Sequence, residues 1–193
     1  NPRIEKTFSP SICNRLDRNT SGIIIGAKNY ASLKMINDSI KKGNVNKYYK
    51  TIVKGIIKKD ETIEGYLIKN EELNKVKILN EKKDDSKKVI TRIKPLAISG
   101  EYSLLEIELI TGRTHQIRAH LASIGHPVIG DIKYGDKKTN RYFQEKYGLD
   151  SQFLHAYRIV FNELDEPLEY LNRKEFIGKL GEKFEKIEKD LFK

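Results

Sequence analysis

The chain has 193 residues, which suits one domain with a core large enough to hold a rigid site. Lysine and arginine number 37 against 27 acids, a formal net charge of +10, and such a basic chain attracts polyanions, of which nucleic acid is the commonest. No apolar run approaches the roughly 18 residues that a membrane span needs. The lone Cys13 excludes an intrachain disulfide and fits a reducing compartment, so we expect a cytoplasmic protein.

The first third of the chain predicts a strand, a helix and a second strand. The β-branched run at 23–25 predicts a short buried strand. Asn29 can cap a helix that Gly43 ends. Residues 47–55 then alternate between two faces, with Tyr49 on the more apolar one, as a strand does.

The middle of the chain is expected to form antiparallel strands. Short apolar pieces at 66–68 and 76–79 predict a hairpin within a region rich in charged residues. Two longer strands, 88–98 and 102–110, are separated by a Ser-Gly turn signal at 99–100, which favours an antiparallel pair.

The last third begins with the segment "TGRTHQIRAHLASIGHP". Thr114 predicts a helix start there, and Gly125 with Pro127 predicts its end. A strand is expected at 153–162, and a helical apolar stripe runs from Phe176 to the end of the chain. The predicted fold is α+β, a mixed, largely antiparallel β-sheet with flanking helices, in one domain over residues 1–193.

Asp17 is the first candidate for chemistry, because it stands between Arg15 and Arg18 directly before a Thr-Ser-Gly turn. On this stretch alone, ordinary turn chemistry explains the aspartate equally well, since its carboxylate can accept local backbone hydrogen bonds. Nearby positive charge favours the ionised carboxylate, however, and a buried ionised carboxylate is a nucleophile or an electrostatic stabiliser. The flanking arginines therefore favour an active-site role.

The "TGRTHQIR" segment contributes two arginines. Arg113 precedes the predicted helix, and Arg118 lies in its second turn, one position after the apolar Ile117. Arg118 is thereby turned about 100° from the buried stripe and can follow the edge of the core, where it needs a carboxylate or a phosphate. The alternative is an arginine on a solvated helix face.

A metal site is not expected. His115 and His120 are five residues apart and would diverge by about 140° on a helix, so they cannot share one ion. His126 and His155 are interpreted as structural or RNA-facing polar groups, and Cys13 as an inert thiol. The chain contains neither of the glycine-rich phosphate-binding motifs G-x-x-x-x-G-K-[ST] and G-x-G-x-x-G.

Four blocks, in order and spacing, resemble the signature segments of the RluA-type RNA pseudouridine synthases. They read "NRLDRNTSGIIIGAKN", "KYYKTIVKG", "LLEIELITGRTHQIRAHLASIGHPVIGDIKYG" and "LHAYRIVF". The resemblance implies isomerisation of uridine in RNA, without a metal or an organic cofactor. It also implies the catalytic-domain fold of that family.

The resemblance implies roles for single residues. Block matching places the catalytic aspartate at Asp17, the active-site tyrosine at Tyr49 and the arginine that pairs with the aspartate at Arg118. The residues expected to contact RNA and shape the site are Arg15, Arg113, His115 and Gln116. Where many members of the family have histidine, this chain has Asn14.

The implied substrate is large-subunit ribosomal RNA, with transfer RNA as the alternative, and the protein is expected to be monomeric. Members of the family usually carry a further strand and often a small S4-type RNA-binding domain ahead of the first block, so a fragment is expected here. Two rival functions remain. One is a basic RNA-binding module without activity, and the other is glycoside hydrolysis by Asp17 with Asp131, although "GDIKYG" resembles a turn.

Overall fold

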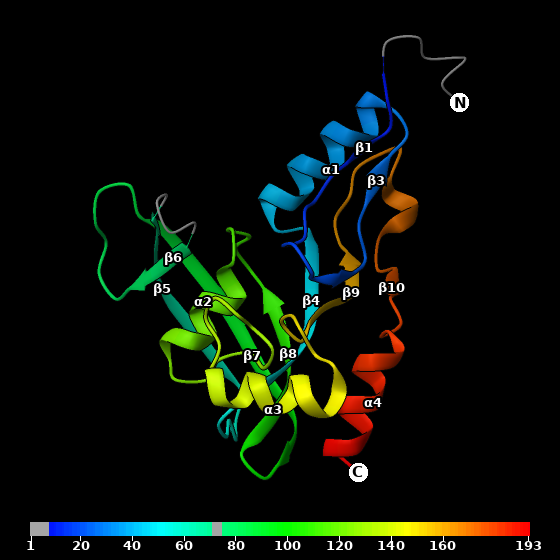
Figure 1. Ribbon diagram of the computed structural model, residues 1–193. Coiled ribbons are helices and arrows are strands. Elements are labelled where there is room, and N and C mark those ends of the chain that lie inside the picture. The colour runs from blue at the N-terminus through cyan, green and yellow to red at the C-terminus, as the bar shows by residue number, and fades with distance from the viewer. Residues whose placement is uncertain (1–7, 71–74) are drawn as a thin grey trace.

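The computed structural model describes residues 8–70 and 75–193, so residues 1–7 and 71–74 of the predicted domain lie outside the described part. A sheet of eight strands forms its centre (Figure 1). The strands are β2 (Ser21–Gly22), β4 (Val45–Lys54), β5 (Glu61–Asn70), β6 (Lys75–Leu79), β7 (Lys87–Ser99), β8 (Tyr102–Leu109), β9 (Leu154–Phe161) and β10 (Glu175–Ile177). Their order is β10-β9-β4-β8-β7-β5-β6, with β2 beside β9. Only the β2–β9 pair is parallel among the pairs of the described strands.

Helices and a small second sheet surround this centre. The helices are α1 (Tyr30–Lys42), α2 (Gln116–Ser123), α3 (Lys137–Tyr147), α4 (Glu182–Leu191) and the 3-10 turn η1 (Glu169–Leu171). Strands β1 (Ser11–Ile12) and β3 (Gly26–Ala27) form the antiparallel second sheet. Helix α2 packs against β6 and β7, and α1 packs against β3 and β4 (Figure 1). The predicted α+β fold with a largely antiparallel sheet is confirmed.

The hairpins and caps follow from local sequence. The 66–68 and 76–79 pieces lie in the antiparallel β5–β6 pair, and the two longer strands form the antiparallel β7–β8 pair. Asn29 Oδ1 accepts a hydrogen bond from the backbone N–H of Ser32 at 2.8 Å, and Gly43 ends α1 in the left-handed conformation. These predictions are confirmed.

The predicted buried strand at 23–25 is wrong. These three isoleucines connect β2 to β3, and the side chain of Ile24 is 48% exposed. Ile23 donates its N–H to the carbonyl of Ala156 in β9 of the large sheet, whereas the carbonyl of Ile25 accepts from the N–H of Cys13, the residue that follows β1 of the small sheet. Because the chain crosses here from one sheet to the other, strand propensity is overridden by tertiary context.

Two other expectations need correction, and one helix was missed. The residue before α2 is His115, in the left-handed conformation with φ of 53°, and Thr114 is not the cap. Phe176 belongs to β10, where it pairs with Ile159 of β9, so the tail helix begins only at Glu182. Helix α3 was not anticipated, although it is capped at both ends by Asp136 and Gly148.

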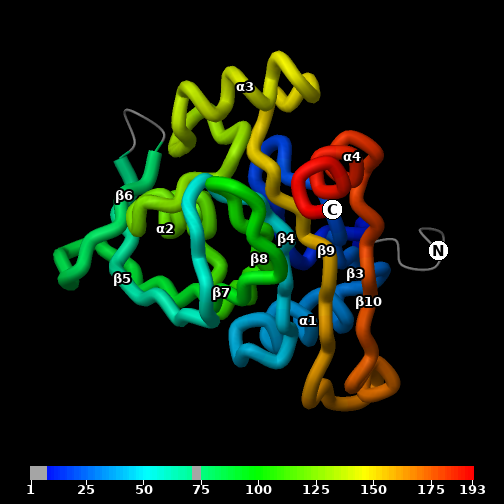
Figure 2. The backbone as a smooth tube through the Cα atoms, turned by 90° about the horizontal axis from the view of Figure 1, so that it is seen from below, coloured from blue at the N-terminus to red at the C-terminus, as the bar shows by residue number. Residues whose placement is uncertain are grey.

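The main core lies where α2, α3 and α4 meet the sheet. Its fully buried side chains include Ile52, Leu105, Ile107, Leu121, Phe143, Phe153 and Ile187. Helix α4 is fixed by Phe184, whose ring stacks on Phe153 with 4.1 Å between centroids, and it lies beside β9 and β10 (Figure 2). This packing makes β4, β8 and β9 a rigid platform for the residues they carry. Among the described residues, no helix is long and apolar enough to cross a membrane.

Candidate active site

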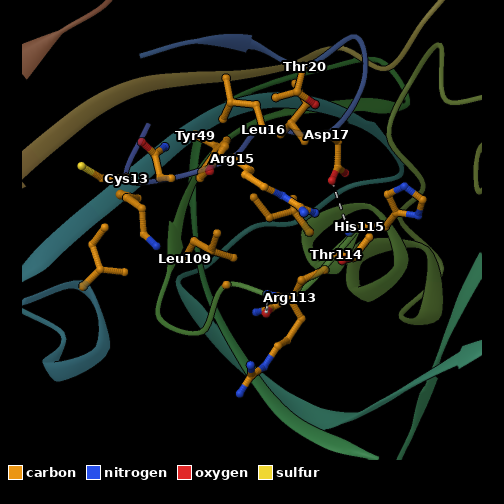
Figure 3. A pocket seen from close by; sticks show the side chains of 17 residues that line it. Cys13, Arg15, Leu16, Asp17, Thr20, Tyr49, Leu109, Arg113, Thr114 and His115 are labelled. Carbon is orange, nitrogen blue, oxygen red and sulfur yellow. Dashed lines mark hydrogen bonds between the residues drawn. The ribbon is translucent and has the colours of Figure 1, made fainter. Parts of the chain in front are cut away.

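A cavity of about 330 Å³ lies between β4, the loop before α2 and the loop that contains Asp17 (Figure 3). Six of the seven predicted site residues line it, namely Arg15, Asp17, Tyr49, Arg113, His115 and Gln116. The seventh, Arg118, reaches Asp17 from α2. The structure therefore brings together residues that are spread over more than a hundred positions of the chain, since Asp17 and Arg118 are 101 residues apart.

Asp17 is held from α2 and the loop before it. Its Oδ2 accepts from Arg118 Nη1 at 3.3 Å, and its Oδ1 accepts from the backbone N–H of His115 at 3.4 Å. Both bonds are long, and the Asp17 side chain keeps 20% of its surface exposed to the cavity. Within the described part of the chain, neither Arg15 nor Arg18 forms an ion pair with it. The local turn explanation is therefore insufficient, because both carboxylate partners come from a distant segment.

Arg118 is shared between two carboxylates. Its Nε and Nη2 donate to Asp131 at 2.7 and 2.9 Å, which is a bidentate pair, and its Nη1 faces Asp17. Burial alone would lower the pKa of Arg118, but the hydrogen bonds to Asp131 and the charges of both acids raise it overall. Asp131 therefore fixes the orientation of the Arg118 guanidinium through Nε and Nη2, which leaves Nη1 to donate to Asp17.

Asp131 supports Arg118, whereas the sequence had suggested a turn residue or the second carboxylate of a hydrolase. Its side chain is fully buried, and Oδ1 also accepts the backbone N–H groups of Lys133 and Tyr134 at 2.8 and 3.0 Å. Both oxygens are thus engaged by donors, and Asp131 does not line the cavity. Because both oxygens are taken up by Arg118 and the backbone, and the side chain does not reach the cavity, Asp131 is not placed to act with Asp17 on a glycosidic bond, which argues against the two-carboxylate hydrolase.

Tyr49 is placed by the centre of the sheet. It pairs with Ile107 of β8 and with Ala156 of β9, next to a register shift in the β4–β9 ladder. The residue is 6% exposed while it lines the cavity. Burial and, next, the charge of Asp17 raise the pKa of Tyr49 to about 12, so the hydroxyl stays protonated at neutral pH.

This pKa predicts a stability effect at high pH. An unfolded tyrosine has a pKa of about 10, so burial of the neutral phenol stabilises the fold below that pH, and the stabilisation is lost as the pH rises towards about 12. We therefore expect the free energy of unfolding of the parent, measured with urea, to fall between pH 10 and about 12. The fall should exceed that of Tyr49→Phe by up to about 2–3 kcal/mol. The same pH dependence in both proteins would contradict the raised pKa of Tyr49.

Gln116 supports the loop instead of facing a ligand. Its Oε1 accepts from Thr111 Oγ1 at 2.9 Å and from the backbone N–H of Arg113 at 3.1 Å. Its Nε2 donates to the carbonyl of Ile90 at 3.0 Å and to Thr91 Oγ1 at 3.1 Å. Because every donor and acceptor of the amide is used, Gln116 fixes the turn that carries Arg113, and its contact with RNA stays a prediction.

His115 joins the cavity to the β5–β6 hairpin. Its Nδ1 lies 3.0 Å from the hydroxyl of Tyr134, which accepts the backbone N–H of Val76 in β6 at 2.8 Å. Burial lowers the pKa of His115, which favours the neutral ring and lets the hydroxyl proton of Tyr134 point at Nδ1. No sequence pattern indicated Tyr134, whose hydroxyl bonds to residues of two distant segments.

The two other arginines predicted at the site, Arg15 and Arg113, are available to a ligand. In Figure 3 the side chain of Arg15 runs towards Asp17, whereas that of Arg113 extends away from it. In the part of the chain that the structure describes, neither guanidinium has a hydrogen bond or an ion pair. Free guanidinium donors beside a carboxylate suit contacts to phosphate groups.

The other histidines are structural. His120 is buried on α2 and bonds to Thr91 Oγ1 at 3.0 Å. His155 lies between Ser21 Oγ at 2.8 Å and the carbonyl of Gly178 at 3.2 Å, which helps to hold the chain after the Asp17 turn. Among the described residues, no group of three or more His, Cys, Asp or Glu side chains could hold a metal ion.

The loop with Asp17 is anchored on its far side. The N–H of Thr20 bonds to the carbonyl of Asp17 at 2.9 Å, and Gln152 Nε2 donates to the carbonyl of Arg18 at 2.7 Å. Gly22 then passes so close to β9 that an added Cβ would lie 2.2 Å from the carbonyl oxygen of Ala156, and its φ of +123° also disfavours a side chain.

Gly22→Ala should therefore displace the Asp17 loop and lower the free energy of unfolding by about 2 kcal/mol or more. The matched control is Gly26→Ala, since nothing lies within 4 Å of a Cβ built there. Urea unfolding of both variants provides the measurement. If both variants unfold like the parent, the close approach to β9 does not fix the loop.

Comparison with known proteins identifies the family. A family model described as RNA pseudouridylate synthase matches residues 1–123. The ribosomal large subunit pseudouridine synthase C of Vibrio vulnificus is 34% identical over 183 residues, which cover 93% of this chain and 55% of that protein. The ribosomal large subunit pseudouridine synthase D of Borreliella burgdorferi is 39% identical over 132 residues, which cover 68% of this chain and 40% of that protein. The chain belongs to the RNA pseudouridylate synthase family, and it spans about half the length of the curated relatives it matches.

Solved structures agree on the fold. Human RNA Pseudouridylate Synthase Domain Containing 4 superposes with a TM-score of 0.73 at 20% identity, covering 95% of this chain and 77% of that one. Human RNA Pseudouridylate Synthase Domain Containing 1 gives 0.68 at 24% identity, covering 94% and 80%. At these identities the likeness shows a common fold, and the resemblance noted from the sequence blocks is confirmed at the level of the family.

Proposed function

We propose that this chain isomerises uridine to pseudouridine in RNA and that Asp17 is its catalytic residue. In this reaction the bond from C1′ to N1 breaks, the uracil turns, and a bond from C1′ to C5 forms. The proton leaves C5 and a proton is gained at N1, so atoms balance without an added reactant. The observation that carries the proposal is the carboxylate of Asp17, held by Arg118 at the wall of a cavity with free cations.

The arrangement suits this chemistry in three respects. Attack on C1′, attack on the ring and removal of a sugar proton all need a carboxylate, and the pairing with Arg118 supplies a charge partner in a confined cavity. A uridine stacked within RNA cannot reach such a cavity, so the base must be flipped into it. Tyr49, which lines the cavity, then offers an aromatic ring on which the flipped base can stack.

Large-subunit ribosomal RNA is the substrate we favour, and transfer RNA is the alternative. The support comes from relatives whose names state ribosomal large subunit pseudouridine synthase C and D, at 34% and 39% identity. The net charge of +10 suits either RNA. The lone Cys13 favours the reducing cytoplasm, where both RNAs reside.

The test follows the proton that is lost from C5. Ribosomal and transfer RNA labelled with tritium at C5 of uridine are incubated with the protein, and tritium released to water is counted. We expect release from large-subunit ribosomal RNA and the appearance of pseudouridine at defined positions. Release from transfer RNA alone would select the alternative substrate, and the absence of release from every RNA of the source cell would overturn the proposed function.

A further inference from the structure

Lys47 lies in the catalytic cavity but has no role so far. It precedes Tyr49 by two positions on β4, so both side chains leave the same face of the strand, and both line the cavity. Its ammonium group lies against the turn before α2, since a Cβ built on Gly112 would be 3.5 Å from Lys47 Nζ. The cation therefore sits between the central strand and the loop of Arg113.

Lys47 differs from the other lysines of its strand by having no partner. Lys50 donates to Glu188 at 2.8 Å, and Lys54 donates to Asp136 at 3.1 Å. Within residues 8–70 and 75–193, by contrast, the ammonium group of Lys47 has no hydrogen bond and no ion pair. Burial lowers its pKa, and no neighbouring acid opposes that shift.

The charges of the cavity indicate what is missing. Among the described residues that line it, Asp17 is the one acid, and Arg118 already holds that carboxylate. A partly buried cation without a partner is costly unless a bound group brings the opposite charge. The cavity is thus complete only with an anion beside Lys47.

We propose that Lys47 binds a phosphate group of the RNA strand at the nucleotide whose base enters the cavity. The inference rests on the proposed function and adds a phosphate subsite to it. Ribose and phosphate are neighbours in the strand, so one nucleotide can present its sugar and base to Asp17 and Tyr49 while Lys47 takes the phosphate. Lysine suits this task because its ammonium group is a compact point charge that binds phosphate.

The experiment measures RNA binding without turnover. Affinity for structured RNA is determined over a series of salt concentrations in an Asp17→Asn background, alone and combined with Lys47→Met or Lys47→Gln. Each lost phosphate contact should reduce the slope of log affinity against log salt by about 0.7–0.9, and affinity at fixed salt should fall about tenfold. The control is Lys186→Met, which removes an exposed lysine of α4.

The melting temperature of the Lys47 variants should equal or exceed that of the parent, because an unpaired, partly buried cation is removed. A reduced slope for both Lys47 variants but not for Lys186→Met supports the subsite. An unchanged slope, or the same loss in the control, overturns it. Binding needs no turnover, so the two proposals can fail separately. If the parent chain, with Asp17 intact, releases no tritium while the Lys47 variants still reduce the slope, the proposed function is overturned and the anion subsite stands.

Discussion

Asp17→Asn should reduce pseudouridine formation by a factor of about 10³ or more while RNA still binds with at least the affinity of the parent. The change keeps the shape of the side chain and removes its charge, so the group that acts on the nucleotide is lost. RNA affinity should hold or rise slightly, because one negative charge leaves a cavity lined by Arg15 and Arg113. Tritium release and RNA titration measure the two quantities separately.

The matched control is Asp38→Asn, which makes the same chemical change on the surface of α1. Asp38 has 48% of its side chain exposed and pairs only with Lys41, at 3.4 Å, among the interactions of the described residues. We expect its activity and stability to equal those of the parent. If Asp17→Asn forms pseudouridine at nearly the rate of the parent, Asp17 is not the catalytic residue and the active site lies elsewhere.

This experiment also separates the enzyme from an RNA-binding module without activity. A module that only binds RNA gains nothing from a carboxylate among cations, since the carboxylate repels phosphate. The structure adds that Asp17 has three partners: Arg118 and the backbone N–H of His115 donate to its carboxylate, and the N–H of Thr20 donates to its backbone carbonyl. Such fixation is what a reacting group requires.

Local patterns predicted much of the fold because the interactions that determine it are local. The cap at Asn29, the end of α1 at Gly43 and the two hairpins depend on residues a few positions apart, and each was read correctly. The strand predicted at 23–25 is wrong because its hydrogen-bond partners lie in different places: Ala156 is in β9 of the large sheet, and Cys13 follows β1 of the small sheet.

The site could be predicted from the sequence only in part, because several of its contacts join segments that are distant in the chain. Matching of blocks selected Asp17, Tyr49 and Arg118, which the structure places at one cavity or in contact with it. The more tightly bound carboxylate of Arg118 is Asp131, which lies 13 residues further along the chain in a segment that resembled an ordinary turn. Which acid a buried arginine selects depends on tertiary packing, and periodicity carries no information on it.

The loop before α2 gives a second example. Thr114 has the composition of a helix cap, yet the carboxylate that reaches this loop belongs to Asp17, which bonds to the N–H of His115 across 98 residues. In the structure the backbone before α2 is contacted by this distant carboxylate, and Thr114 does not cap the helix. The predicted cap is therefore wrong at the segment that holds the proposed catalytic residue.

Asp131→Asn is expected to have the largest effect on stability. The variant leaves the buried guanidinium of Arg118, whose side chain is 5% exposed, with a neutral amide in place of its bidentate carboxylate. Removal of one partner from a buried ion pair costs about 3–5 kcal/mol. For a domain of this size the melting temperature should fall by about 6–20 °C. Calorimetry measures it, and a change below about 2 °C would show that the pair is not a structural centre.

The double variant Arg118→Met/Asp131→Asn separates stability from catalysis. Removal of both charges avoids an uncompensated buried cation, so the double variant should be more stable than Asp131→Asn alone. The double variant should nevertheless be inactive, because Asp17 Oδ2 no longer has the Arg118 donor that faces it at 3.3 Å. A double variant that recovers both stability and turnover would show that Arg118 serves only the packing of Asp131. Recovered stability without turnover would identify Arg118 as the residue that orients and charge-balances the catalytic carboxylate.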